Sequence, residues 1–269
     1  LAGGLGDDAL ERIKPDWREQ LARASLLAGS VRYHRDQCDQ AEPWLRRAVA
    51  LYDALGNADN SAEARSNLAG CLRRTGDFKQ AVALQQQVLS DTVARLGPDA
   101  PRTLEQRFAL AVFATDLGNY KLAEHELRSA IRGIEHSHPD MRVALGASVL
   151  RLASVLDRVG QSEEAGRLFK RGIAIRNELY GSDSAAVAAA RFSYGTYLLG
   201  QQHPGRAEAE FRAVINAAGA EPATRAHGLR YLGRALRDQG RLTDAIVQLK
   251  AAEKAYRSIG GLELDDGVG

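Results

Sequence analysis

Residues 67–89 have the sequence NLAGCLRRTGDFKQAVALQQQVL, in which a tight turn at residues 75–77 separates two amphipathic patterns. In the second pattern, Ala81, Leu84 and Val88 recur at a spacing that places them on one face of an α-helix. The stretch therefore predicts two helices joined by a tight turn. The same helix-turn-helix pattern returns along almost the whole chain.

Three columns of small or turn-forming residues show this repetition. An alanine near the start of the second helix falls at Ala41, Ala81, Ala123, Ala165, Ala207 and Ala245. A small residue in the first helix falls at Gly29, Ala69, Ala111, Ala153, Gly195 and Gly233. The turn position, five residues before each alanine, is Gly76, Gly118, Gly160 and Gly240 in four repeats and Asp36 and Gln202 in the other two. A fixed period of this length is typical of a solenoid, in which no helix pair can bury its apolar side alone.

The composition favours helix and argues against several classes of protein. Aromatic residues make up only 6% of the chain, so we expect a core built from Leu, Ala, Val and Ile. The net charge of +2 is too small to indicate nucleic-acid binding, and no apolar run approaches the length of a membrane span. Cys38 and Cys71 are too few for a disulfide framework, so we expect two small buried side chains.

We predict an all-α solenoid of about six repeats. The repeats are expected at about residues 17–60, 61–101, 102–140, 141–183, 184–221 and 222–260. Residues 1–16 are expected to form a loose lead-in, with the first helix beginning at Trp17. The acidic, Gly-rich residues 261–269 are expected to form a frayed tail. The chain starts at Leu1 without a signal-like segment, so we expect a cytoplasmic piece of a longer protein.

Several positions of the repeat carry a family resemblance. They are Leu68, Ala69, Leu72, Gly76, Asp77, Phe78 and Ala81 in one repeat, Leu110, Ala111, Gly118, Asn119, Tyr120, Ala123 and Ala130 in the next, and Leu232, Gly233, Leu236, Gly240, Arg241 and Ala245 in the last. This pattern resembles that of the tetratricopeptide repeat (TPR) family. The interval of 42 residues is longer than the roughly 34 residues usual there. The linkers at residues 96–99 and 138–140 resemble those of the long repeats in kinesin light chains and bacterial signalling proteins.

The resemblance implies a right-handed superhelix whose first helices line a concave groove for a peptide or a partner protein. On this sequence, the implied groove residues are Asn67, Arg73, Arg74, Phe108, Arg151, Arg158, Phe192, Arg230, Tyr231, Arg234 and Arg237. Arginine forks pair with carboxylates and aromatic rings supply apolar anchors, so we predict an acidic peptide or protein segment as partner. The alternative is a solvated face whose ion pairs contribute about 0–1 kcal/mol each. Arg230, Arg234 and Arg237 are the strongest candidates because they recur at helical spacing.

The sequence indicates no enzyme, cofactor or metal site. No Gly-rich phosphate loop follows a strand. The nearest approach to a metal motif is His125, His136 and His138 with Glu124 and Glu135, and no fourth ligand stands at a suitable spacing. The chain does not resemble the TPR subtype that binds the C-terminal carboxylate of chaperones. Only Asn67 matches the lysine and asparagine positions of that subtype.

We therefore predict a non-catalytic protein- or peptide-binding scaffold, the interaction or sensor region of a larger signalling or regulatory protein. A receptor for a short signalling peptide that changes the pitch of the superhelix is the alternative with the same fold. An enzyme domain is a third and less favoured interpretation. The sequence leaves self-association open.

Overall fold

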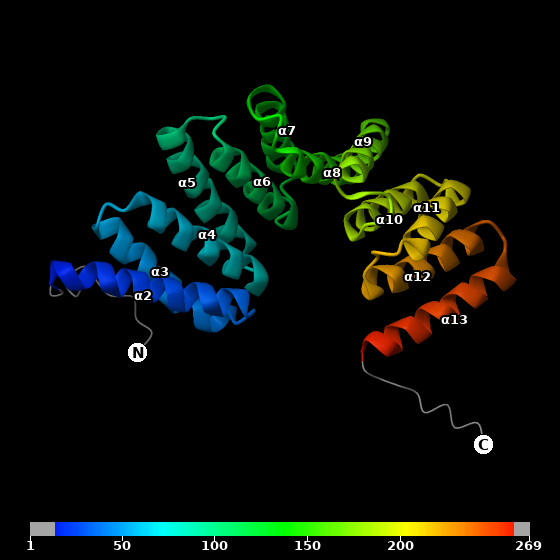
Figure 1. The fold of residues 1–269 in the computed structure, drawn as a ribbon, viewed down its shortest axis with the longest axis horizontal. Helices are drawn as coiled ribbons and strands as arrows, with labels where there is room; N and C mark the ends of the chain where they lie inside the picture. The colour runs from blue at the N-terminus through cyan, green and yellow to red at the C-terminus, as the bar shows by residue number, and fades with distance from the viewer. Residues whose placement is uncertain (1–13, 261–269) are drawn as a thin grey trace, which may run out of the picture. The chain divides into compact units, whose positions relative to one another are not determined.

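The computed structural model describes residues 14–260, which form twelve α-helices and no strand. The helices are α2 (Pro15–His34), α3 (Cys38–Ala54), α4 (Ala58–Thr75), α5 (Phe78–Leu96), α6 (Pro101–Asp116), α7 (Tyr120–Ser137), α8 (Arg142–Arg158), α9 (Ser162–Tyr180), α10 (Ala185–Gly200), α11 (Pro204–Asn216), α12 (Pro222–Asp238) and α13 (Leu242–Ile259). Even-numbered helices are the first helices of the repeats and odd-numbered helices are the second (Figure 1). None of these helices is both long and apolar enough to span a membrane. The all-α repeat fold predicted from the sequence is confirmed.

The helices form two compact units, residues 1–138 and residues 139–269, which we call the N-terminal and C-terminal units. Within each unit, every helix packs against the next helix along the chain. The first helices of neighbouring repeats are also in contact. α2 packs against α4, and α10 packs against both α8 and α12. The repeat pattern predicts one array and contains no signal for a division into two units. The predicted limits of the individual repeats remain a prediction.

The first described helix begins earlier than we predicted. α2 starts at Pro15 rather than at Trp17. Proline is well suited to the first turn of a helix, because its missing N–H has no partner within the helix there. The rest of the predicted lead-in, up to residue 13, and the predicted tail at residues 261–269 lie outside the described residues.

The turn column of the sequence corresponds to one backbone conformation. The four glycines of this column have φ between 77° and 93°, with the largest value at Gly76. Asp36 and Gln202 adopt φ of 61° and 57° at the same position, although side chains uncommonly occupy this region. After Gly76, the backbone N–H of Asp77 donates to the carbonyl of Leu72 at 2.8 Å, which closes the first helix. The turn positions that repeat in the sequence therefore all have the same left-handed backbone conformation.

The anchor alanines lie where the two helices of a repeat cross. Ala41, Ala81, Ala123, Ala165 and Ala207 are 0% exposed, and Ala245 is 3% exposed. At the crossing of α10 and α11, the ring of Phe211 packs directly on Gly195. A Cβ atom at Gly195 would lie only 2.7 Å from that ring. Small residues are therefore required where the paired helices approach closely.

The cores of the two units differ in composition. Cys38 and Cys71 are buried free thiols in the N-terminal core, as predicted, and burial raises the pKa of the Cys71 thiol. The expectation of an aliphatic core fails in the C-terminal unit, where the aromatic residues gather. The rings form two groups of three. Ring centroids 5.3–5.9 Å apart join Phe169, Tyr194 and Tyr197, and ring centroids 5.1–5.9 Å apart join Phe192, Phe211 and Tyr231. A low overall aromatic content did not reveal this clustering, because the rings meet across helices from different repeats.

A substitution at the α10–α11 crossing tests the need for a small residue. Gly195→Ala should lower the free energy of unfolding by about 1–3 kcal/mol, because the Phe211 ring is fully buried and cannot move aside. Gly200→Ala is the matched control in the same helix, since nothing lies within 4 Å of a Cβ atom there. We expect it to be neutral or to stabilise by up to about 1 kcal/mol. Equal effects of the two substitutions in urea unfolding would contradict this account of the crossing.

Glu208 connects the last two repeats. Its carboxylate accepts hydrogen bonds from Gln239 and Arg241 of the next repeat, both at 2.9 Å, and from Arg212 on its own helix. Burial opposes ionisation of Glu208, but these three hydrogen bonds outweigh it and lower the pKa of the carboxyl. The ionised form therefore stabilises the contact between α11 and the α12–α13 turn.

Glu208→Gln should destabilise the protein in a pH-dependent way. A carboxyl with a lowered folded-state pKa contributes its stability above its ordinary pKa of about 4.3, and loses it as the pH falls through the folded-state pKa. We expect Glu208→Gln to cost ~1 kcal/mol at neutral pH. The difference from the wild type should shrink below about pH 4. Thermal melts at a series of pH values measure this, and a difference that stays constant down to pH 3 would count against the role of the ionised carboxylate.

Candidate functional site

The predicted binding residues of the N-terminal unit mostly connect neighbouring first helices. The Asn67 amide on α4 donates to the Ser30 hydroxyl on α2 at 2.9 Å. Arg73 pairs with Asp116 on α6 at 2.8 Å, and its guanidinium lies 5.6 Å from the centroid of the Phe113 ring. Asn67 and Arg73 are therefore held by contacts between repeats.

Arg74 has a similar structural environment. It donates to the backbone carbonyl of Tyr33 at 2.7 Å and pairs with Asp36 at 3.1 Å. Its guanidinium also lies 4.4 Å from the centroid of the Tyr33 ring. The fourth predicted residue of this unit, Phe108, is half-buried on α6. These contacts fix the ends of α2 and α4 against each other, so Arg74 is already occupied within the fold.

The predicted residues on α8 and α10 differ in their availability. Arg158 is exposed and Arg151 is half-buried, and neither forms an ion pair within residues 14–260. Phe192 is taken up by packing, because its ring lies 5.1 Å from that of Tyr231 and 5.9 Å from that of Phe211. Phe192 therefore helps to hold α10, α11 and α12 together, whereas no such contact engages Arg151 or Arg158 among the described residues.

The remaining four predicted residues come together around one pocket. Arg230, Tyr231, Arg234 and Arg237 line a cavity of about 240 Å³ together with Gly233 and Leu249. Arg237 pairs with Asp238 at 2.8 Å, and Arg234 lies 3.8 Å from the same carboxylate. Arg230 lies over the Tyr231 ring at 5.0 Å. Two of these three arginines share Asp238 as their acidic neighbour, and the third lies over an aromatic ring, which leaves an excess of positive charge beside the apolar floor.

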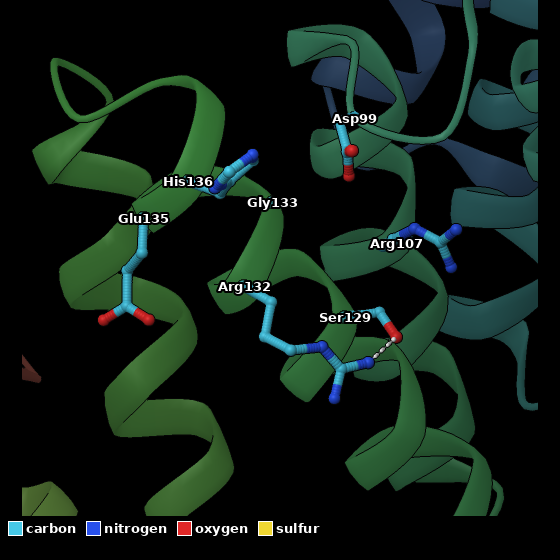
Figure 2. Close-up of a pocket in the computed structure, with 7 residues that line it drawn as sticks. All are labelled: Asp99, Arg107, Ser129, Arg132, Gly133, Glu135 and His136. Carbon is cyan, nitrogen blue, oxygen red and sulfur yellow. Dashed lines mark hydrogen bonds between the residues drawn. The ribbon is translucent and has the colours of Figure 1, made fainter.

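A larger pocket lies elsewhere and was not predicted. It has a volume of about 740 Å³ and is lined by Asp99, Arg107, Ser129, Arg132, Gly133, Glu135 and His136 of the N-terminal unit. Figure 2 shows Arg132 and Ser129 joined by a hydrogen bond, and Asp99 and Arg107 on a neighbouring part of the pocket wall. The Arg107 guanidinium is neutralised by Glu126 at 2.6 Å. Acidic and basic groups mix in this pocket, so its charge selects no particular ligand.

The histidines considered for a metal site are separated in the structure. His136 lines the large pocket, and His138 is engaged through its Nε2 atom, 2.8 Å from the backbone carbonyl oxygen of Asp99. His125 is exposed on α7. Within residues 14–260, no three His, Cys, Asp or Glu side chains are grouped so that they could hold a metal ion.

Comparison with known proteins places the chain in a family. The family model for the tetratricopeptide repeat matches residues 20–92, 62–136 and 145–220. These matches cover most of the chain, which therefore belongs to the TPR family. Among curated proteins, none matches the sequence.

Solved structures share the fold at low sequence identity. BtubC (BKLC) from P. vanneervenii has a TM-score of 0.69 at 17% identity, over 91% of this chain and 94% of that protein. A putative kinesin light chain with TPR-like repeats from Podosopora anserina has a TM-score of 0.63 at 20% identity, over 73% and 95%. A signal transduction ATPase (STAND) with a TPR sensor from Pyrococcus horikoshii has a TM-score of 0.70 at 12% identity, over 96% and 39%. The predicted resemblance to TPR proteins of the kinesin light chain type is confirmed.

Removal of Glu126 tests whether the large pocket is part of the supporting structure. The side chains of Arg107 and Glu126 are only 16% and 9% exposed. Glu126→Ala should therefore cost about 2 kcal/mol, because it leaves a nearly buried arginine without its counter-charge. Glu163→Ala breaks a pair whose side chains are 68% and 88% exposed, and it should cost less than about 0.5 kcal/mol. If denaturant unfolding gave the same loss for both variants, the Arg107–Glu126 pair would have no special structural role.

Proposed function

We propose that this TPR scaffold binds an acidic segment of a partner protein through arginines on the first helices of the C-terminal unit. The observation that carries the proposal is the pocket in which Arg230, Arg234 and Arg237 surround Tyr231 and Leu249. Arginine pairs with a carboxylate through two parallel hydrogen bonds, which gives geometric specificity as well as affinity. Tyrosine and leucine beside it supply the apolar anchors around which binding energy concentrates.

The charge balance at this pocket supports an acidic ligand. Asp238 is the carboxylate that Arg234 and Arg237 share, and the side chains of these arginines are 54% and 60% exposed. Exposed ion pairs of this kind contribute about 0–1 kcal/mol, so a ligand carboxylate can replace Asp238 at little cost. Arg230 has the Tyr231 ring rather than a carboxylate as its neighbour.

Arg151 and Arg158 extend the proposed surface within the same unit. Both belong to α8, and α10 packs against α8 on one side and α12 on the other. An extended acidic segment that crosses α10 would meet arginines at both ends of its path. In the N-terminal unit, the arginines are engaged in contacts between repeats, so we assign them to the scaffold rather than to the ligand.

A second candidate function is that of a peptide-responsive sensor. One similar structure is described as a signal transduction ATPase with a TPR sensor, at 12% identity. The division of this chain into two compact units gives a sensor two bodies whose arrangement a ligand can change. Small-angle scattering with and without ligand separates the candidates, because a sensor changes its dimensions on binding and a docking surface does not.

Removal of the three arginines tests the proposed function. The variant Arg230→Ala/Arg234→Ala/Arg237→Ala should weaken binding of a fluorescent peptide rich in glutamate and leucine by roughly tenfold or more. Affinity for the wild type should fall as salt is added, because exposed charges are screened. A peptide with lysine in place of glutamate should not bind.

The matched control removes three basic residues on second helices of the same unit. Arg167→Ala/Lys170→Ala/Arg257→Ala removes the exposed Lys170 side chain and breaks two exposed pairs within single helices, so both peptide affinity and folding should be preserved. Anisotropy titrations measure the affinity, and circular dichroism measures the fold. Equal affinity of the wild type and the first triple variant would refute the proposed site.

A further inference from the structure

We propose that the end of the C-terminal unit binds an acidic amphipathic helix of a partner protein, which docks in the place of a following first helix. The inference rests on the proposed function and specifies the shape of the ligand. The surface consists of Arg230, Arg234 and Arg237 on α12 and of Ile246 and Leu249 on α13. We call this surface the terminal face.

Leu249 stands at a position that is buried in every earlier repeat. It lies four residues after the anchor alanine of α13. The equivalent residues are Leu45, Gln85, Leu127, Phe169 and Phe211. These five side chains are at most 2% exposed, whereas Leu249 is 43% exposed. This position of the repeat is therefore normally buried, and on α13 it is exposed.

The cover in earlier repeats comes from the first helix that follows. The Phe211 ring on α11 lies 5.7 Å from the Tyr231 ring on α12. The Gln85 amide on α5 donates to the Gln106 side chain on α6 at 2.6 Å. α13 is the last described helix and α12 packs against it, so Leu249 has no equivalent cover within the described residues (Figure 1).

Ile246 is exposed beside Leu249, at a position that is buried in one earlier repeat and half-buried in the other four. It lies one residue after the anchor alanine, at the position of Val82 on α5. Val82 is 6% exposed and packs in a cluster with Leu110 of the following first helix, whereas Ile246 is 55% exposed. Ile246 and Leu249 therefore form an apolar pair, three residues apart on one face of α13, that matches a buried contact inside the array.

Arg237 on the terminal face also has an equivalent inside the array. The position four residues after the small residue of a first helix faces the next first helix. In α4 this residue is Arg73, which pairs with Asp116 of α6 at 2.8 Å. In α12 it is Arg237, whose carboxylate partner is the adjacent Asp238 of its own helix. A helix covering the terminal face would bring its own carboxylate to Arg237.

The inner interfaces also indicate the side-chain pattern of the docking helix. Tyr231 covers Phe211, and Phe113 packs against the cluster that contains Val82. Together with Asp116, which pairs with Arg73, they lie at positions −2, +2 and +5 from the small residue of their helix. An occupant with two large apolar residues four apart would cover the apolar pair of α13. An acidic residue three further on would reach Arg237. The pattern is that of an amphipathic helix with carboxylates along one edge of its apolar stripe.

A second copy of the chain is the competing occupant, and its charge does not fit. The outer face of α2 exposes Leu27 and Val31 at the −2 and +2 positions, so it meets the apolar requirement. It places His34 at the +5 position, where Arg237 requires a carboxylate. Charge complementarity therefore favours an acidic partner over self-association.

The test compares two helical peptides of the same composition. The first has about five turns, with leucines four residues apart and glutamates one turn beyond each leucine. The second has the same residues in an order that spreads leucine and glutamate around the helix. We expect the patterned peptide to bind the full chain roughly tenfold or more tighter than its isomer in anisotropy titrations.

Two neighbouring substitutions provide the matched variants. Ile246→Asp should weaken the patterned peptide by roughly tenfold or more, because it removes an apolar contact and repels glutamate. Val247→Asp should leave the affinity unchanged. Val247 lies two residues after the anchor alanine, and the equivalent residues Pro43, Ala83, His125, Arg167 and Ala209 are all exposed. Circular dichroism should show an unchanged fold for both variants.

The possible outcomes separate this inference from the proposed function. If both peptides bind equally and the triple arginine variant loses both, the acidic site stands and the docked helix is wrong. If neither peptide binds, both proposals fail. A dimer of the free chain that Ile246→Asp dissociates in sedimentation would show a second copy as the occupant. A variant ending at Gly260 that binds roughly tenfold tighter would show residues 261–269 as the occupant. Either of the last two results would overturn the assignment to a partner helix.

Discussion

No helix pair in this chain can bury its own apolar side, so each repeat depends on the first helix of the next one. The residue four positions after the anchor alanine shows this dependence directly. It is at most 2% exposed in five repeats, and at Leu249, where no described helix follows, it is 43% exposed. The close crossings, the left-handed turns and the contacts between first helices all serve to place that covering helix. The stability of the fold therefore lies in contacts between neighbours, as expected for a stacked array.

The same constraint divides the arginines into two groups. Arg73 and Arg74 face another first helix, and carboxylates, a carbonyl group and aromatic rings hold them there. Arg230 and Arg237 instead line the pocket beside Tyr231, where the carboxylate of Arg237 is the adjacent Asp238 of its own helix. Arginine content alone does not identify a binding surface in this protein. The position of each arginine relative to the next repeat decides whether it is held by contacts between repeats.

Cavity size is a poor guide to function in this protein. The pocket of about 740 Å³ in the N-terminal unit contains acidic and basic groups together, and one of its arginines is neutralised by Glu126 at 2.6 Å. The much smaller pocket beside Tyr231 has a net positive wall and an apolar floor. TPR proteins share the scaffold at identities below 25%. The chemistry of the exposed side chains, rather than the fold, must therefore select the partner.

The sequence by itself determined the helices, the turns and the helix crossings of this protein. Gly76 and its equivalents, including Asp36 and Gln202, all adopt positive φ, and the anchor alanines are all buried. These features depend on spacing within some twenty residues, so a single sequence reveals them. Only the tertiary structure decided that Arg73 pairs with Asp116, that Phe192 packs among aromatic rings, and that the helices form two units. Such contacts join residues about forty positions apart. They depend on how neighbouring helices pack, which the pattern of any one helix does not specify.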